Sequence, residues 1–330
     1  MEAFYRKIYL HSWQIIKTNW YLLCFGFFVA ALGLTGDFKA LLNLQDQIQT
    51  QDIISTTMTS WIDIFYSFST AQMTWEKLPA LLTLVAILFV FAVVLVMAIS
   101  SQGALIDATN QSHKKTTFKN PLVSHLQVGI ENFWSLFSLN IINKLISFVF
   151  VVGVIVPIID LLYLSQSATI MNLLITLIIF FIIIPLAIIV SFVTRYGASY
   201  VIIKKQNTTQ AFFSAWNLFR VNWIISLENA GLLLLITMAY TIVVISILAF
   251  VVTPFLIVGF LVAQISNLAF LFLMIICGLL VIFILLSSIA IFASYYTIVW
   301  SELFLRLTER GQKHSKIHRL ANRHMPFLTK

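Results

Sequence analysis

Residues 211–223 read Ala-Phe-Phe-Ser-Ala-Trp-Asn-Leu-Phe-Arg-Val-Asn-Trp, and they show how the chain is organised. On a helix, the large apolar side chains of this stretch fall on one side and the polar side chains on the other. The apolar side holds Phe212, Trp216, Phe219 and Trp223, and the polar side holds Gln210, Ser214 and Asn217. A long apolar segment starts immediately after Trp223. The pattern predicts a helix in the membrane surface that leads into a spanning helix.

The same pattern occurs twice more. Near the N-terminus, an apolar side opposes a polar one: Tyr5, Tyr9, Trp13, Ile16 and Trp20 against Lys7, His11, Gln14 and Thr18. In the middle of the chain, Leu122, Leu126, Ile130 and Phe133 oppose Ser124, Gln127 and Glu131, and Trp134 closes the stretch. We interpret these stretches as three repeats, each an amphipathic interfacial helix followed by a pair of spanning helices. The repeats cover residues 1–110, 111–206 and 207–305, and residues 306–330 form a basic cytoplasmic tail.

Composition indicates a membrane protein. The chain has 330 residues, of which 60% are hydrophobic and only 10% charged, whereas soluble domains carry about 25% charged residues. A helix needs about 20 apolar residues to cross a bilayer. The sequence therefore predicts an all-α polytopic protein with six transmembrane helices in one integral membrane domain. Their approximate ranges are 20–36, 78–101, 134–164, 171–193, 223–252 and 268–291.

The segments between these spans have distinct characters. Residues 37–77 form a long loop with a helical stripe, residues 102–119 a polar connection, and residues 253–267 either a tight turn or a short re-entrant dip. Most of the 20 Lys and Arg residues lie on the side that also holds both termini. Because basic residues accumulate in cytoplasmic loops, we expect both termini in the cytoplasm and the protein in the inner, cytoplasmic membrane.

The charge and the cysteines exclude some classes of protein. The net charge of +8 does not indicate nucleic-acid binding, because the basic residues flank the apolar segments. The cysteines, Cys24 and Cys277, both lie inside apolar segments, which argues against a disulfide framework or a Cys-based zinc site. Enzyme motifs such as a His-Glu-x-x-His pair or a glycine-rich phosphate loop are absent from the sequence. We therefore expect no enzymatic activity, cofactor or metal.

Polar residues within spans are the candidate site, since such residues are costly in lipid. The predicted intramembrane polar cluster consists of Asn140, Asn143, Lys144, Glu228 and Asn229. An ion pair between Lys144 and Glu228 would give the cluster a structural role, in which it holds the helices in register. The cluster could instead bind a lipid headgroup or a transported ion, or Lys144 could extend toward the interface.

Four residues are predicted to anchor the chain at the membrane interface: Trp20, Trp134, Arg195 and Trp223. Arg195 could alternatively bind phosphate, because its guanidinium group suits phosphate oxygens.

The repeated entry motif carries a family resemblance. Ser214-Ala215-Trp216 precedes Asn222-Trp223, just as Ser12-Trp13 precedes Asn19-Trp20, whereas the middle repeat has Gln127 in place of the first Trp. In this layout the chain resembles the membrane domain fused to some glycerophosphoryl diester phosphodiesterases and the YciC-like inner-membrane proteins. The resemblance implies a polytopic helical fold. It does not imply their catalysis, because the phosphodiesterase domain is not in this sequence.

Two functions remain open from the sequence. The first is a non-enzymatic membrane protein that binds lipid or acts in envelope or membrane homeostasis. The second is the permease subunit of an ATP-driven exporter, with a separate ATPase as partner. The expected partners are membrane lipids. Anionic lipids should bind at the basic tail, with about 1 kcal/mol for each well-placed Lys or Arg. We expect no nucleic-acid partner.

Overall fold

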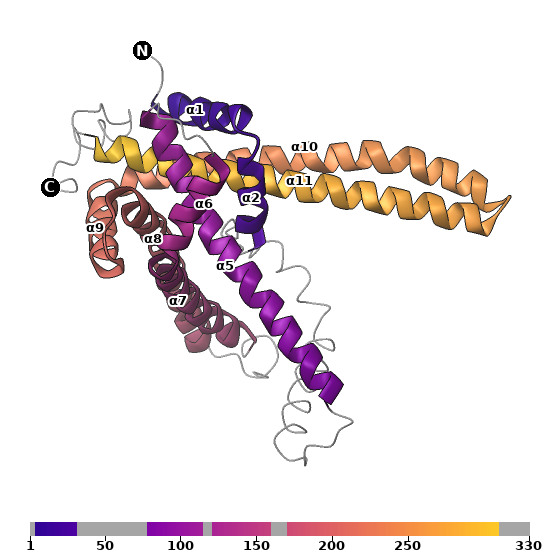
Figure 1. Ribbon diagram of the computed structural model, residues 1–330. Coiled ribbons are helices and arrows are strands. Elements are labelled where there is room, and N and C mark those ends of the chain that lie inside the picture. The colour runs from indigo at the N-terminus through magenta and orange to yellow at the C-terminus, as the bar shows by residue number, and fades with distance from the viewer. Residues whose placement is uncertain (1–3, 32–77, 115–120, 160–169, 310–330) are drawn as a thin grey trace.

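The structure is a computed structural model that describes residues 4–31, 78–114, 121–159 and 170–309 (Figure 1). The regular elements within these ranges are all α-helices, which confirms the predicted all-α class for the described part of the chain. The helices are α1 (Phe4–Thr18), α2 (Leu22–Ala31), α5 (Leu78–Lys114), α6 (Pro121–Glu131), α7 (Phe133–Ile159), α8 (Ile170–Lys204), α9 (Thr208–Val221), α10 (Trp223–Ala263) and α11 (Asn267–Thr308).

Four of the described helices are long and apolar enough to cross a membrane. They are α10, α11 and the parts of α5 and α8 that run over Val85–Lys114 and Pro185–Lys204. The predicted loop at residues 37–77, the last five residues of the predicted first span (32–36) and the turn after residue 159 lie outside the described residues. The prediction of a helical membrane protein is thus supported at this coarser level.

Three helices each lead into the next helix through one asparagine. Asn19 follows α1, Asn132 follows α6, and Asn222 follows α9. Each asparagine donates its side-chain Nδ2 to the carbonyl oxygen four residues earlier, at 3.1, 2.9 and 3.1 Å respectively. These bonds satisfy carbonyls at the end of the short helix, where intrahelical partners are missing. The chain therefore ends one helix and starts the next, in a new direction, within one to three residues.

Six helices or parts of helices pack into one body, which we call the head. It consists of α1, α6, α9 and the C-terminal parts of α5, α8 and α11, at residues 98–110, 192–202 and 293–305. In the head, α6 packs on α5, α9 on α8, and α1 on α11. Most of the buried side chains lie here, and the three apolar clusters of the protein include Leu105, Ile202 and Phe304 of the head.

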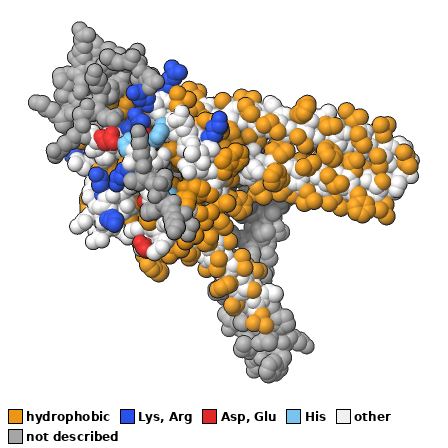
Figure 2. All heavy atoms as spheres, turned by 45° about the horizontal axis from the view of Figure 1, so that its top comes forward, with side chains coloured by type: hydrophobic (Ala, Val, Ile, Leu, Met, Phe, Trp, Pro, Cys, Tyr) orange, Lys and Arg blue, Asp and Glu red, His pale blue; other side chains and the backbone are white. Residues whose placement is uncertain are grey.

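The remaining parts of the long helices leave the head as pairs. The contacts pair α7 with α8, and α10 with α11, while α2 packs between α5 and α11. In Figure 1 the α10–α11 pair points away from α5, α7 and α8, so the helices diverge from the head. Figure 2 shows the charged side chains gathered at the head and an almost wholly hydrophobic surface over the α10–α11 pair.

Several helices extend beyond their predicted spans. The polar segment predicted from residue 102 is helical as far as Lys114. Helix α5 continues through Gln102, Asp107 and Thr109, whose side chains are buried and hydrogen-bonded. Likewise α8 continues past residue 193 to Lys204, and α11 past residue 291 to Thr308. Residues 306–308 of the predicted tail therefore belong to α11.

The segment 253–267 contains a tight turn and no re-entrant dip. Helix α10 runs through Pro254 to Ala263, and α11 starts at Asn267. Ser266 caps α11 by accepting a hydrogen bond from the backbone of Ala269. Backbone N–H and C=O groups without hydrogen-bond partners are costly in an apolar environment. Because α10 stays helical past Pro254, only the backbone groups of the short turn lack helical partners.

Candidate functional site

Arg195 lies where α8 separates from α11. Its guanidinium carbon stands 4.8 Å from the ring centre of Tyr296 and 5.0 Å from that of Trp300, both on α11. Contacts of this kind between a cation and an aromatic face stabilise by about 0.5–2 kcal/mol and fix the position of the guanidinium group. The predicted anchor is therefore a half-buried cation held between two aromatic rings.

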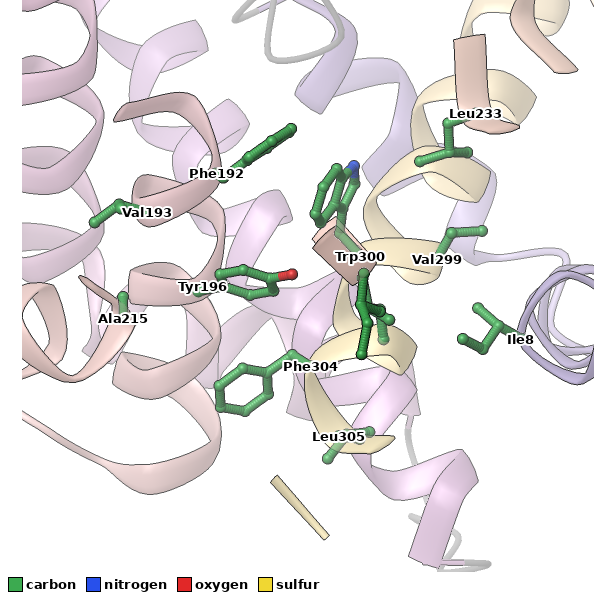
Figure 3. Close-up of a cluster of buried hydrophobic side chains, with 12 residues drawn as sticks. Ile8, Phe192, Val193, Tyr196, Ala215, Leu233, Val299, Trp300, Phe304 and Leu305 are labelled. Carbon is green, nitrogen blue, oxygen red and sulfur yellow. The ribbon is translucent and has the colours of Figure 1, made fainter. Parts of the chain in front are cut away.

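Aromatic side chains of α8 surround the same place. In Figure 3, Phe192 and Tyr196 reach from α8 toward Trp300. The Trp300 ring centre lies 5.2 Å from that of Phe192 and 5.8 Å from that of Tyr196. The buried Tyr196 hydroxyl shares a hydrogen bond of 2.7 Å with Ser226 Oγ on α10. This bond joins α8 to α10 close to the start of α10, so three helices meet beside Arg195.

Glu228 and Asn229 of the predicted polar cluster lie under α1. The hydroxyl of Tyr5 donates a hydrogen bond to the Glu228 carboxylate, and that of Tyr9 donates to Asn229 Oδ1 at 3.0 Å. Burial, with a smaller contribution from Tyr295, raises the pKa of Tyr9, so it stays a neutral donor. These two residues thus attach α1 to α10.

The other members of the predicted cluster lie on α7 and do not join them. Asn140 is buried and donates to Gln102 Oε1 on α5 at 2.8 Å. Asn143 is half-buried, and Lys144 is exposed. Within the described residues, no Lys144–Glu228 ion pair is formed, and the Glu228 carboxylate accepts from Tyr5 instead. The predicted cluster is therefore two separate polar contacts, one between α7 and α5 and one between α10 and α1.

A second polar group, which the sequence analysis missed, surrounds the fully buried Glu302 on α11. Arg306, one turn later, donates to Glu302 Oε1 from Nε at 2.8 Å and approaches it with Nη2 at 2.7 Å. The Nδ1 atoms of His11 on α1 and His113 on α5 both lie 3.4 Å from Glu302 Oε2. His113 Nε2 also lies 2.6 Å from Glu309. This ionic cluster ties α1, α5 and α11 together in the head.

A third polar contact joins α6 to α5. The buried His125 Nδ1 lies 2.8 Å from Asp107 Oδ2, and Gln111 Nε2 donates to the same oxygen at 2.9 Å. The Tyr21 ring stacks on His125 with the two ring centres 6.2 Å apart. The signal available in the sequence was weak: Asp107 is the lone acid in residues 98–110, among small residues that favour close packing.

The three predicted tryptophan anchors are all exposed at helix junctions. These are the α1–α2, α6–α7 and α9–α10 junctions. Trp20 and Trp134 are 73% and 74% exposed, and Trp223 is 38% exposed. Large exposed aromatic side chains beside an asparagine turn are typical of a membrane–water interface. Among the described residues, no group of three or more His, Cys, Asp or Glu side chains is arranged to hold a metal ion.

No protein-family model, curated protein or solved structure matches the chain. A function for the chain must therefore be inferred from the geometry of the described residues. That geometry defines a helical protein with a polar head, diverging apolar helix pairs and an arginine where the pairs separate.

Proposed function

We propose that this chain is a non-enzymatic integral protein of the cytoplasmic membrane that binds phospholipid between its diverging helix pairs and acts in membrane homeostasis. In this proposal the helix pairs cross the bilayer and the head lies at its cytoplasmic surface. The basic residues of the tail bind anionic headgroups, and both termini are cytoplasmic.

The exposed apolar surface of the α10–α11 pair is the observation that carries the proposal. Only 6% of the most apolar 18-residue stretch of each helix is buried within the protein. Phe250, Phe272 and Phe283 are 83%, 62% and 68% exposed. Soluble monomers seldom expose apolar patches larger than a few hundred Å². A surface of this kind needs lipid or another apolar partner to cover it.

The length of the exposed pair also fits a bilayer. Beyond Leu233, α10 continues for residues 234–263, which at 1.5 Å per residue spans about 45 Å. The exposed part of α11, residues 267–289, spans about 35 Å. A bilayer is about 30 Å thick in its hydrocarbon core and about 40–45 Å with its headgroups. Both lengths therefore support a crossing of one bilayer.

The shared asparagine junctions support the threefold repeat. Asn19, Asn132 and Asn222 make the same side-chain bond. Helix α6 packs on α5, and α9 packs on α8, in each case the long helix that comes before it in the chain. Helix α1 packs on α11, the last helix of the chain, which completes the circuit around the head. We therefore propose that α1–α5, α6–α8 and α9–α11 are three equivalent units, each with two spans, arranged in a closed ring.

The test is purification of the full chain from native membranes in a mild detergent, followed by native mass spectrometry. Phospholipid retained in stoichiometric amount, with no protein partner, supports the proposal. A stoichiometric ATPase would overturn it in favour of an exporter permease, whose docking surface would be the segments 102–133 and 195–222. Protein that retains neither lipid nor a partner would also overturn lipid binding.

A further inference from the structure

The strongest unexplained feature is a cation at the separation point of two apolar helices. Arg195 is held between the Tyr296 and Trp300 rings at 4.8 and 5.0 Å. These contacts fix the position of the guanidinium carbon, and the guanidinium N–H donors lie at the edges of its plane. A guanidinium edge suits the two oxygens of a phosphate group, which it can bind bidentately.

A second, independent observation concerns the neighbouring Trp300. Its indole Nε1 is buried and has no hydrogen-bond partner among the described residues. Indole N–H is a donor only, and leaving a buried donor without an acceptor costs about 1–3 kcal/mol. An acceptor would satisfy this donor, and an acceptor is also the kind of group that a guanidinium binds.

The helices on both sides of this point carry apolar side chains that continue outward. Ile188 is 41% exposed and lies seven residues before Arg195, on the same face of α8. Ile289 is 47% exposed and lies seven residues before Tyr296, on the same face of α11. Both helices run toward the head, so each isoleucine lies about 10 Å farther out along its helix pair. An acceptor group at Arg195 would thus have apolar surface next to it on two sides.

We propose that Arg195 and Trp300 form a binding site for the phosphate of a phospholipid, whose acyl chains lie along the facing apolar surfaces of α8 and α11. The phosphate accepts from the Arg195 guanidinium and from Trp300 Nε1, while the Tyr296 ring holds the guanidinium in place. This site rests on the proposed lipid-binding function and assigns it to one place in the chain.

The test compares three variants of the full chain. Arg195→Gln removes the cation, and Trp300→Phe removes the indole N–H but keeps an aromatic ring. Arg220→Gln is the matched control, because Arg220 is an exposed arginine on α9 and its loss changes the net charge equally. Each protein is titrated in detergent with phosphatidylglycerol and, separately, with inorganic phosphate, and bound ligand is counted by native mass spectrometry. Thermal unfolding identifies any variant that does not fold.

The expected result is that Arg195→Gln weakens phosphatidylglycerol binding by about tenfold or more, as loss of a charge-assisted hydrogen bond predicts. Trp300→Phe should weaken it by about fivefold, with Arg220→Gln unchanged. If wild type binds lipid and both site variants bind it equally well, the site is wrong while the lipid-binding function stands. If wild type binds no lipid, the proposed function fails as well. Binding of inorganic phosphate that excludes lipid would overturn the assignment to a phospholipid.

Discussion

Replacement of Gly129 by alanine would disrupt the closest contact between α5 and α6. A Cβ atom at Gly129 would lie 2.0 Å from the backbone oxygen of Ser100. Ordinary contacts of a Cβ begin at about 3.4 Å, so the two helices would have to separate by about 1.4 Å. The obstacle is backbone within α5 and cannot rotate away. Gly103 faces the same crossing, with a Cβ position 2.9 Å from the Gly129 Cα.

The size of the effect follows from two opposing terms. Overpacking of this kind costs about 1–3 kcal/mol, and separation of α6 would also stretch the 2.8 Å contact between His125 and Asp107. Alanine in place of glycine returns up to about 1 kcal/mol of helix propensity. The substitution Gly231→Ala on α10 measures the gain in helix propensity alone, because a Cβ there meets nothing within 4 Å. We therefore expect Gly129→Ala to be less stable than Gly231→Ala by about 1–3 kcal/mol.

The assay is thermal and denaturant unfolding of each purified variant in the same mild detergent, followed by circular dichroism and tryptophan fluorescence. Gly231→Ala should unfold at or slightly above the wild-type temperature, and Gly129→Ala clearly below it. Equal stability of the two variants would refute the close approach of α5 and α6, and with it the packing of the head described above.

Three further predictions concern the polar contacts of the head, each measured by the same unfolding assay. Asp107→Ala should destabilise by about 1–3 kcal/mol, because it leaves the buried His125 without its acceptor; the change should nearly vanish in a chain that already carries His125→Leu. Glu302→Gln should cost about 3–5 kcal/mol, because it leaves the bonded Arg306 charge uncompensated in the head. Asn222→Ala should cost about 0.5–1.5 kcal/mol through loss of its bond to Leu218.

Each of these predictions has an outcome that contradicts it. An undiminished effect of Asp107→Ala beside His125→Leu would mean that Asp107 acts through another contact. A stable Glu302→Gln variant would show that the ionic cluster does not tie α1, α5 and α11 together. For the asparagine, a substitution without effect would indicate that the α9–α10 junction is fixed by packing alone.

The helix junctions could be predicted from the sequence because their signal is local. The tryptophans at 20 and 223 and the alternation of apolar and polar faces place the starts of α2 and α10 within about two residues of those observed. Amphipathic periodicity and interfacial aromatics depend on neighbouring residues only. The same signals place the end of α6 and the start of α7 within about two residues of those observed.

The interior of the head could not be predicted in this way. Residues 102–114 were expected to be a polar connection because they contain Asp107, Lys114 and several amides. In the structure these residues are helical, and Asp107 is buried because His125, 18 residues later, reaches it from α6. A buried polar side chain is stable where a partner forms a hydrogen bond with it. Local periodicity does not identify a partner that is distant in the sequence.

The predicted polar cluster is two separate contacts for a related reason. Counting from the entry tryptophans places Asn140 and Asn229 at the same repeat position, and these residues, with a Lys144–Glu228 ion pair beside them, meet only if the repeats pack around a common axis. The structure separates them because α7 packs on α8 and α5, whereas Glu228 faces Tyr5 on α1. Two residues at equal depth can lie on different helix pairs, and only the packing decides which polar groups meet.

The distribution of polar groups indicates where the chain could distinguish one lipid from another. Residues 82–97, 234–263 and 268–289 contain no Asp, Glu, Lys, Arg or His. The Thr237, Thr241 and Ser246 hydroxyls within them donate to the carbonyl four residues earlier on their own helix, and so offer no donor to a ligand. In the proposed function these surfaces contact acyl chains. Headgroup recognition is then expected where the helices leave the head, and there Arg195 lies against the ring of Trp300, whose N–H is buried.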